Sequence, residues 1–211
     1  MLVHGSSVSG RPSFDLSAPG LGEYSVMNVF ASAGFDTWAI DCEGYGHSTH
    51  TEGNSDIRTG VQDLLAAMPV LERETGQRRY HFYGESSGAL RVGALAMVAP
   101  ERLERLALGA FTFTGKGSPT LAARSKNVEY YRSHNRRPRD EAMIRSIFTR
   151  DQPGTGDPAV DVYKRQAQYH ASAGRRDRGQ HRAHRTAGAR GAGTARGPGR
   201  RCSCRRYRSG C

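Results

Sequence analysis

The sequence predicts an α/β protein: a three-layer α/β/α sandwich built around a partial, mostly parallel sheet. Two observations predict it. Short strand-like runs alternate along residues 1–110 with longer segments whose apolar positions recur at helical spacing. A glycine-rich turn also joins one of these runs directly to an apolar helix-like segment. Strands that alternate with helices favour a parallel sheet covered by helices on both faces.

The first two strands are expected at the start of the chain. Met1–Val3 runs into the tight turn His4–Ser7. A helix is expected from Gly22 to Ala33, and a second strand from Phe35 to Ile40. That strand ends in a glycine-containing loop, Asp41–Ser48, which we expect to be structural.

The next helix has the clearest pattern. Between Asp56 and Thr75, apolar residues follow the spacing of one buried helical face. Asp56 suits the N-cap, and Gly76 suits the C-terminal cap. Pro69 should kink this helix or shift its boundary, because proline has no N–H to donate.

The remaining elements follow in the same alternation. Tyr80–Tyr83 is the third strand, Ser87–Val98 a mostly buried helix that ends before a proline, and Leu103–Ala110 the fourth strand. Two amphipathic helices are expected beyond them, at Pro119–His134 and Arg139–Thr149.

Gly84-Glu85-Ser86-Ser87-Gly88 is the most informative motif. It fits G-x-S-x-G, a sharp strand-to-helix turn that presents a serine hydroxyl. The pattern alone is weak in a chain with 26 glycines, but the strand before it and the helix after it make it specific. The outer glycines permit a turn in which a side chain would collide. The alternative is a glycine-rich turn with an idle serine.

With this motif the chain resembles the α/β-hydrolase family. Four features occur in the family's order: His4-Gly5 after a strand, the Asp41–Ser48 loop, the elbow at Ser86, and a strand after the elbow helix. The resemblance covers residues 1–114. It implies that the four strands are the third to sixth of the family's eight. The first two and last two strands are then missing, so we expect a fragment.

The resemblance also implies roles for individual residues. Ser86 would be the nucleophile that forms an acyl-enzyme. The backbone N–H groups of Ser6 and Ser87 would form the oxyanion hole. Four further residues would shape the elbow and the oxyanion loop: His4, Gly5, Gly84 and Gly88.

No catalytic acid or histidine is nominated. The family places them after late strands, in the order Ser, acid, His. The downstream histidines are His134, His170, His181 and His184, and the candidate acids are Asp140, Asp151, Asp157, Asp161 and Asp177. None of these follows an apolar strand. We therefore expect this chain to be inactive or weakly active.

Three regions are predicted: a partial core at 1–114, a helical cap or lid at 115–160, and an Arg/Gly-rich tail at 161–211. Ordinary packing helices are the alternative for 115–160. The tail carries 14 Lys and Arg against two Asp, and has no Leu, Ile, Met, Phe or Trp. Such a composition cannot offset the cost of ordering the backbone, so we expect disorder.

The tail has three interpretations. It could be a nucleic-acid-binding extension, a solvated linker, or sequence that is not native. The hexapeptide Asp161–Gln166 looks like the translation of a transposon end used as a sequencing adapter. We therefore predict a chimera from about residue 161.

The predicted function is a serine hydrolase that acts on carboxylic esters or related small acyl substrates. The alternative is a non-catalytic α/β scaffold with a basic tail that binds nucleic acid. No cofactor and no metal are expected, since Cys202-Ser203-Cys204 lacks zinc-site spacing. No membrane partner is expected, nucleic acid is a partner only if the tail is genuine, and the expected location is cytoplasmic.

Overall fold

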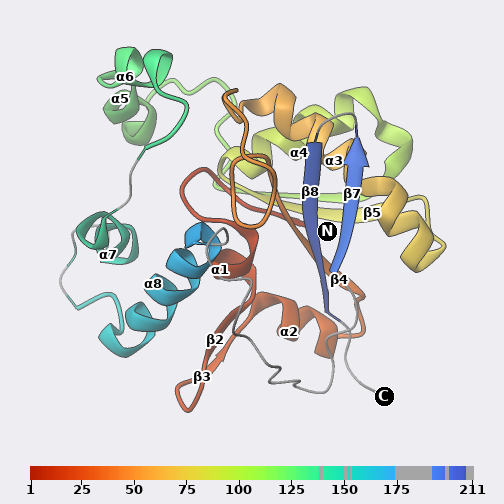
Figure 1. The fold of residues 1–211 in the computed structure, drawn as a ribbon, viewed down its shortest axis with the longest axis horizontal. Coiled ribbons are helices and arrows are strands. Elements are labelled where there is room, and N and C mark those ends of the chain that lie inside the picture. The colour runs from red at the N-terminus through yellow and green to blue at the C-terminus, as the bar shows by residue number, and fades with distance from the viewer. Residues whose placement is uncertain (138–139, 150–151, 153, 174–191, 198–199, 208–211) are drawn as a thin grey trace.

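The computed structural model describes residues 1–137, 140–149, 152, 154–173, 192–197 and 200–207 of the chain. Its middle layer is a sheet with strand order β6-β5-β1-β4-β8-β7 (Figure 1). Four neighbouring strands, from the β6 edge inward, pair in parallel: β1 (Leu2–Val3), β4 (Thr37–Asp41), β5 (Tyr80–Glu85) and β6 (Leu103–Gly109). The predicted α/β fold with a mostly parallel sheet is confirmed.

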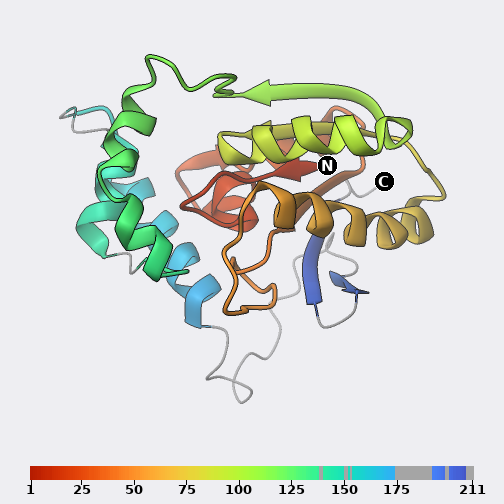
Figure 2. The same ribbon diagram turned by 90° about the horizontal axis from the view of Figure 1, so that it is seen from above.

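Helices cover both faces of this sheet, as predicted. Helices α3 (Ile57–Thr75) and α4 (Ser87–Val98) lie side by side along one face (Figure 2). Helices α1 (Gly10–Phe14) and α2 (Val26–Ser32) lie against the other. Because side chains of a strand alternate between faces, Ile40 of β4 packs on the first side and Ala39 on the second.

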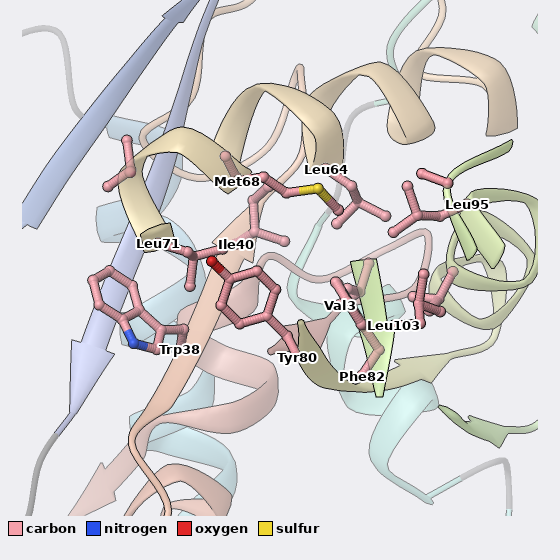
Figure 3. Close-up of a cluster of buried hydrophobic side chains, with 14 of the residues drawn as sticks. Val3, Trp38, Ile40, Leu64, Met68, Leu71, Tyr80, Phe82, Leu95 and Leu103 are labelled. Carbon is pink, nitrogen blue, oxygen red and sulfur yellow. The ribbon is translucent and has the colours of Figure 1, made fainter. Parts of the chain in front are cut away.

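The larger core lies between α3, α4 and the sheet (Figure 3). Apolar residues spaced for one face of α3 meet residues from all four parallel strands. Figure 3 labels the main participants: Val3, Trp38, Ile40, Leu64, Met68, Leu71, Tyr80, Phe82, Leu95 and Leu103. This packing fixes the two helices on the sheet, and it thereby fixes the turn between β5 and α4.

The ends of α3 form as predicted. The Asp56 carboxylate accepts a hydrogen bond from the Thr59 N–H at 2.7 Å, and Gly76 closes the helix with φ +70°. Pro69 lies inside α3, which continues through it to Thr75, so the expected shift of the boundary does not occur.

The segment before α2 differs from the prediction. Gly22–Tyr24 is not helical but forms β3, which pairs antiparallel with β2 (Leu16–Ala18). Helix α2 therefore begins only at Val26. Its N-cap is Ser25, whose hydroxyl accepts a hydrogen bond from the Asn28 N–H at 3.1 Å. The apolar residues from Val26 onward do lie on a helix, and the N-cap Ser25 marks where that helix begins.

The described segment after β6 folds into helices, and the last of them packs against α1 and β2. These helices are α5 (Pro119–Ser125), α6 (Val128–Ser133), α7 (Glu141–Thr149) and α8 (Pro158–Ala173). The helix expected over 119–134 is thus split in two. Helices α5 and α6 lie at one end of the molecule (Figure 1), and no described side chain between residues 111 and 137 is buried. That the segment is a cap stays a prediction.

In the described part of residues 161–211, regular secondary structure stands where we expect disorder, and the division of the chain into three regions stays a prediction. Helix α8 runs through Asp161–Gln166, and β7 (Ala192–Gly197) and β8 (Arg200–Tyr207) form an antiparallel pair. Strand β8 lies antiparallel to β4, so that Thr37 pairs with Tyr207. An open strand edge presents unpaired N–H and C=O groups, which extended backbone of any composition can satisfy. Residues 174–191 and 208–211 lie outside the described part.

Strand β6 forms the opposite edge of the sheet. Among the described strands it pairs with β5 alone, and its Leu106 and Leu108 are 38% and 37% exposed. Met97 and Val98 at the end of α4 are also exposed. Unpaired backbone beside apolar side chains is a template for association between chains.

We expect the chain to self-associate through this edge, and Leu108→Lys to reduce that association. A charge on an edge strand disfavours pairing with another strand. Light scattering at matched concentrations measures the effect. Leu21→Lys is the control, since Leu21 is 39% exposed but lies in the turn between β2 and β3. Equal association of the wild-type and Leu108→Lys chains would refute the role of the edge.

Candidate functional site

Ser86 stands at the sharp turn between β5 and α4. It has φ 56° and ψ −118°, a backbone conformation that side-chain-bearing residues rarely adopt. Its N–H donates to the Gly109 carbonyl at 2.9 Å, and its own carbonyl accepts from the Ala89 N–H at 3.0 Å. The sheet and the helix therefore hold the strained residue from both sides.

The two outer glycines of the motif are required by space. A Cβ on Gly84 would lie 2.5 Å from the Gly88 carbonyl oxygen. A Cβ on Gly88 would lie 2.2 Å from the Val3 carbonyl oxygen. Real Cβ contacts are never so short, so the elbow helix approaches β5 and β1 as closely as it does only because both positions lack side chains. The role of both glycines in shaping a nucleophile elbow stays a prediction.

The turn after β1 lies directly against the elbow. A Cβ on Gly5 would sit 3.1 Å from the Ser86 Cβ and 3.6 Å from the Ser86 Oγ. Ser7, two residues later, has φ 147° and is a second strained serine. The structure thus brings residues 4–7 to Ser86, although 80 residues separate the segments.

Backbone N–H groups are available around Ser86. Ser87 is the first residue of α4, and the first N–H groups of a helix have no partner within it. They also carry the positive end of the helix dipole, which favours negative charge nearby. Ser6 follows Gly5, the residue packed on the elbow. These placements are compatible with the two donors that the resemblance implies.

His4 is fully buried, and both of its ring nitrogens have partners. Its Nε2 lies 3.1 Å from the Cys42 N–H and accepts from it, so the ring proton sits on Nδ1. Nδ1 then donates to the Gly5 carbonyl at 2.7 Å. The ring also packs against Tyr45, with centroids 4.6 Å apart. Both nitrogens are occupied, which agrees with a residue that orders the loop and does not transfer protons.

Asp41 organises the loop that follows β4. One carboxylate oxygen accepts from the Gly10 N–H at 2.8 Å, and the other from the His47 N–H at 3.1 Å. The Ser48 hydroxyl donates to the Asp41 carbonyl. A Cβ on Gly46 would collide with the Asp41 carboxylate, at 2.0 Å. Asp41 thus ties the loop both to its own residues His47 and Ser48 and to Gly10 at the start of α1.

The described downstream histidine and acids have structural partners. His134 is exposed at the end of α6 and stacks on Tyr130 at 4.3 Å. Asp140 accepts from the Met143 N–H at the start of α7, and Asp157 from the Ala159 N–H at the start of α8.

Asp161 pairs with Arg165 at 3.1 Å. The side chain of His170, and Asp151, Asp177, His181 and His184 entirely, lie outside the described part. Within that part, no histidine and acid are brought together beside Ser86.

Two ionisable groups near the site have shifted pKa values. Burial raises the pKa of the Cys42 thiol to about 12, partly offset by the charge of Arg91. Burial lowers the pKa of Lys164 in α8, and the negative charge of Glu85 opposes that shift. Lys164 is therefore within electrostatic range of the residue that precedes Ser86.

Sequence reasoning missed Arg91, which has the largest fully buried side chain among the described residues and is 1% exposed. It lies on α4 one turn beyond the elbow, and it contacts both the turn after β1 and the loop after β4. A signal existed: Arg91 is the single charged residue within the otherwise apolar segment Ser87–Val98. A buried arginine needs hydrogen-bond acceptors to replace water, and the carbonyl groups of His4 and Ser55 lie within reach of Arg91.

No group of three or more His, Cys, Asp and Glu side chains among the described residues is placed to hold a metal ion. No helix in the described ranges is both long enough and apolar enough to cross a bilayer.

Comparison with known proteins gives the family. The sequence profile described as "alpha/beta hydrolase fold" matches residues 13–128, which is more than half of the chain. The chain therefore belongs to the alpha/beta hydrolase fold family. The matched range contains the Asp41 loop and the Ser86 elbow, and it begins after the His4 turn.

One curated relative and two solved structures are similar. The relative is the 2-hydroxy-6-oxononadienedioate/2-hydroxy-6-oxononatrienedioate hydrolase of Paraburkholderia phymatum, 30% identical over 117 residues. That match covers 51% of this chain and 34% of the relative, so the chain spans about a third of that protein's length.

The solved structures are both of the hypothetical protein PA1622 from Pseudomonas aeruginosa PAO1. The selenomethionine form is 26% identical with a TM-score of 0.41, and covers 72% of this chain and 50% of that one. The other form is 24% identical with a TM-score of 0.43, and covers 78% and 55%.

We expect Gly88→Ala to destabilise the chain by several kcal/mol, because its methyl group would overlap the Val3 carbonyl oxygen. Gly93→Ala, on the same helix, is the matched control. Its Cβ would meet nothing closer than 3.9 Å, so alanine should stabilise the helix by up to about 1 kcal/mol. Urea denaturation measures both. A similar response of the two variants would contradict the close packing at the elbow.

Stability should fall at alkaline pH because of Cys42. The folded chain keeps this thiol protonated to about pH 12, whereas the ordinary value is 9.0. Above pH 9 the unfolded state therefore loses a proton that the folded state retains, which costs up to about 1.4 kcal/mol per pH unit. Cys42→Ala should show a shallower decline between pH 9 and 11 in urea denaturation. Parallel profiles for the two chains would contradict the assignment.

Proposed function

We propose that the protein is a serine hydrolase acting on carboxylic esters or related acyl substrates, with Ser86 as the nucleophile. The observation that carries the proposal is the strained backbone of Ser86, held between β5 and α4 with the His4–Ser7 turn against it. Such strain persists only where the surroundings over-determine it, and it collects at functional sites. Membership of the alpha/beta hydrolase fold family supports the same reading.

The chemistry follows from this arrangement. The Ser86 Oγ attacks the acyl carbon, its proton passes to the leaving alkoxide, and an acyl-enzyme forms as the ester bond breaks. Water then releases the acid and restores the hydroxyl. Negative charge develops on the carbonyl oxygen in both steps. The N–H groups of Ser6 and Ser87 are the proposed donors to that oxygen, and losing one such donor typically costs about 3–4 kcal/mol.

The activity of this chain should be low. A serine hydroxyl needs a base, and the described residues place no histidine beside it. Removing the base and acid from a serine hydrolase lowers turnover by about six orders of magnitude. The oxyanion hole and substrate binding still provide some residual rate acceleration. The proposal is therefore that Ser86 is the correct nucleophile in a chain that carries out the first step slowly.

A second candidate substrate class comes from the curated relative. That protein is named for the hydrolysis of 2-hydroxy-6-oxononadienedioate. The nucleophile and the oxyanion-binding amides proposed here could serve such a dicarboxylate as well as a simple ester. A panel containing both substrates, assayed by product formation, separates the two candidates.

The nucleophile is tested with a fluorophosphonate probe, which forms a covalent bond to an activated serine. We expect slow labelling of the wild-type chain, and mass spectrometry of the digested protein should place the adduct on Ser86. Ser86→Ala should abolish labelling. Ser87→Ala is the matched control, because the proposed donor at that position is the backbone N–H, which the substitution leaves in place.

Labelling that persists in Ser86→Ala would contradict the proposal, as would a wild-type chain that is folded and takes up no probe. The same comparison separates the proposal from the alternative of a scaffold without chemistry, since that alternative predicts no difference between Ser86→Ala and Ser87→Ala.

A further inference from the structure

Arg91 occupies an unusual position for a charged residue. It lies on α4 five residues beyond Ser86, with its side chain 1% exposed. A buried guanidinium loses its hydration, and apolar residues of similar volume often fill such sites without loss of stability. General packing therefore does not explain why this position holds an arginine.

The guanidinium joins three separate segments. One terminal nitrogen donates to the Ser55 carbonyl at 3.0 Å and contacts the Ser55 hydroxyl at 3.2 Å. The other terminal nitrogen lies 3.5 Å from the His4 carbonyl oxygen. The guanidinium also stands 5.9 Å from the centre of the Tyr45 ring, which in turn packs on the His4 ring. The elbow helix, the turn after β1 and the loop after β4 thus meet at one side chain.

The contacts of Arg91 and His4 hold two successive peptide groups. Arg91 contacts the carbonyl of the His4–Gly5 peptide, and the His4 ring donates to the carbonyl of the Gly5–Ser6 peptide. In a planar trans peptide the C=O and N–H point in opposite directions. Fixing the Gly5 carbonyl therefore fixes the direction of the Ser6 N–H.

The chain also makes room for this arginine. Gly60 of α3 is buried, and a Cβ there would lie 2.3 Å from the Arg91 Cδ and 2.4 Å from its Nε. Glycine within a helix is destabilising relative to alanine, so its presence here calls for a local reason. Because residue 60 has no side chain, the aliphatic part of the Arg91 side chain can pack directly against the backbone of α3 at this position.

We propose that Arg91 is a positioning residue for the oxyanion-binding amide of Ser6. It acts by holding the His4 carbonyl and the Ser55 loop around the buried His4 ring. This inference rests on the proposed nucleophile Ser86, and it deepens that proposal by naming what aligns the donor opposite it. Arg91 itself does not touch the substrate.

Two variants remove the arginine from its place by independent routes. Arg91→Met deletes the donors while keeping an unbranched side chain. Gly60→Ala leaves the arginine in the chain but puts a methyl group where its stem runs. Gly93→Ala is the matched control, since the same substitution on α4 meets nothing within 3.9 Å. Urea denaturation of each variant separates local effects from loss of fold.

The readouts are the labelling kinetics of Ser86 with a fluorophosphonate and hydrogen exchange of the backbone amides of residues 4–7 by NMR. We expect Arg91→Met and Gly60→Ala to lower the first-order labelling constant about tenfold with little change in probe affinity. That loss is smaller than the roughly 10²- to 10³-fold lost when an oxyanion donor itself is removed. Exchange at residues 4–7 should rise in both variants but not in Gly93→Ala. The double variant should be no worse than either single one, because both remove the same contact.

Wild-type labelling kinetics and unchanged exchange in Arg91→Met would overturn the proposal, as would additive effects in the double variant. Failure of the proposed function gives a different pattern. If the wild-type chain takes no label, Ser86 is not an activated nucleophile, and the exchange of residues 4–7 alone decides whether Arg91 holds the turn: unchanged exchange then rejects its role.

Discussion

The close approach of helix α4 to strand β1 at Gly88 is the contact on which the rest of the site depends. With a Cβ at this position the helix would collide with the carbonyl oxygens of Val3 and His4, at 2.2 and 2.6 Å. Because the helix can approach so closely, the turn before it is tight, and Ser86 is forced into a positive φ. The same approach carries Arg91 to the His4 carbonyl. Backbone strain, the packing of the His4–Ser7 turn and the buried guanidinium therefore have one common geometric origin.

Most of the central fold could be predicted from the sequence, since its patterns are local. Apolar residues at helical spacing with Asp56 and Gly76 at the ends define α3, and a glycine-rich turn between a strand and a helix defines the elbow. Strands β2 and β3 could not be predicted from the sequence, because a strand of three residues is too short to show a periodic pattern. Strand β8 was not predicted for a different reason. It pairs with the open edge of β4, and that edge is a property of the assembled sheet and not of residues 200–207.

The candidate site was predicted unevenly for the same reason. The G-x-S-x-G spacing, together with the strand before it and the helix after it, pointed to Ser86 and the glycines beside it, and the structure shows what a side chain at each glycine would meet. The tautomer of His4 depends on the Cys42 N–H, 38 residues away. The role of Arg91 depends on Ser55, at a separation of 36 residues. The sequence shows that Arg91 interrupts an apolar helix, but only the folded structure shows which carbonyl groups its guanidinium contacts. Nucleophile role and donor assignments stay predictions until they are measured.

The central claim is that the strained elbow presents Ser86 opposite two backbone donors. A crystal structure of the chain after reaction with a phosphonate tests it most directly, because the adduct carries an oxygen where the oxyanion would develop. We expect phosphorus bonded to the Ser86 Oγ, with its oxygen about 3 Å from the backbone nitrogens of both Ser6 and Ser87. An adduct whose oxygen points to solvent, or a phosphonate bonded to another serine, would contradict it.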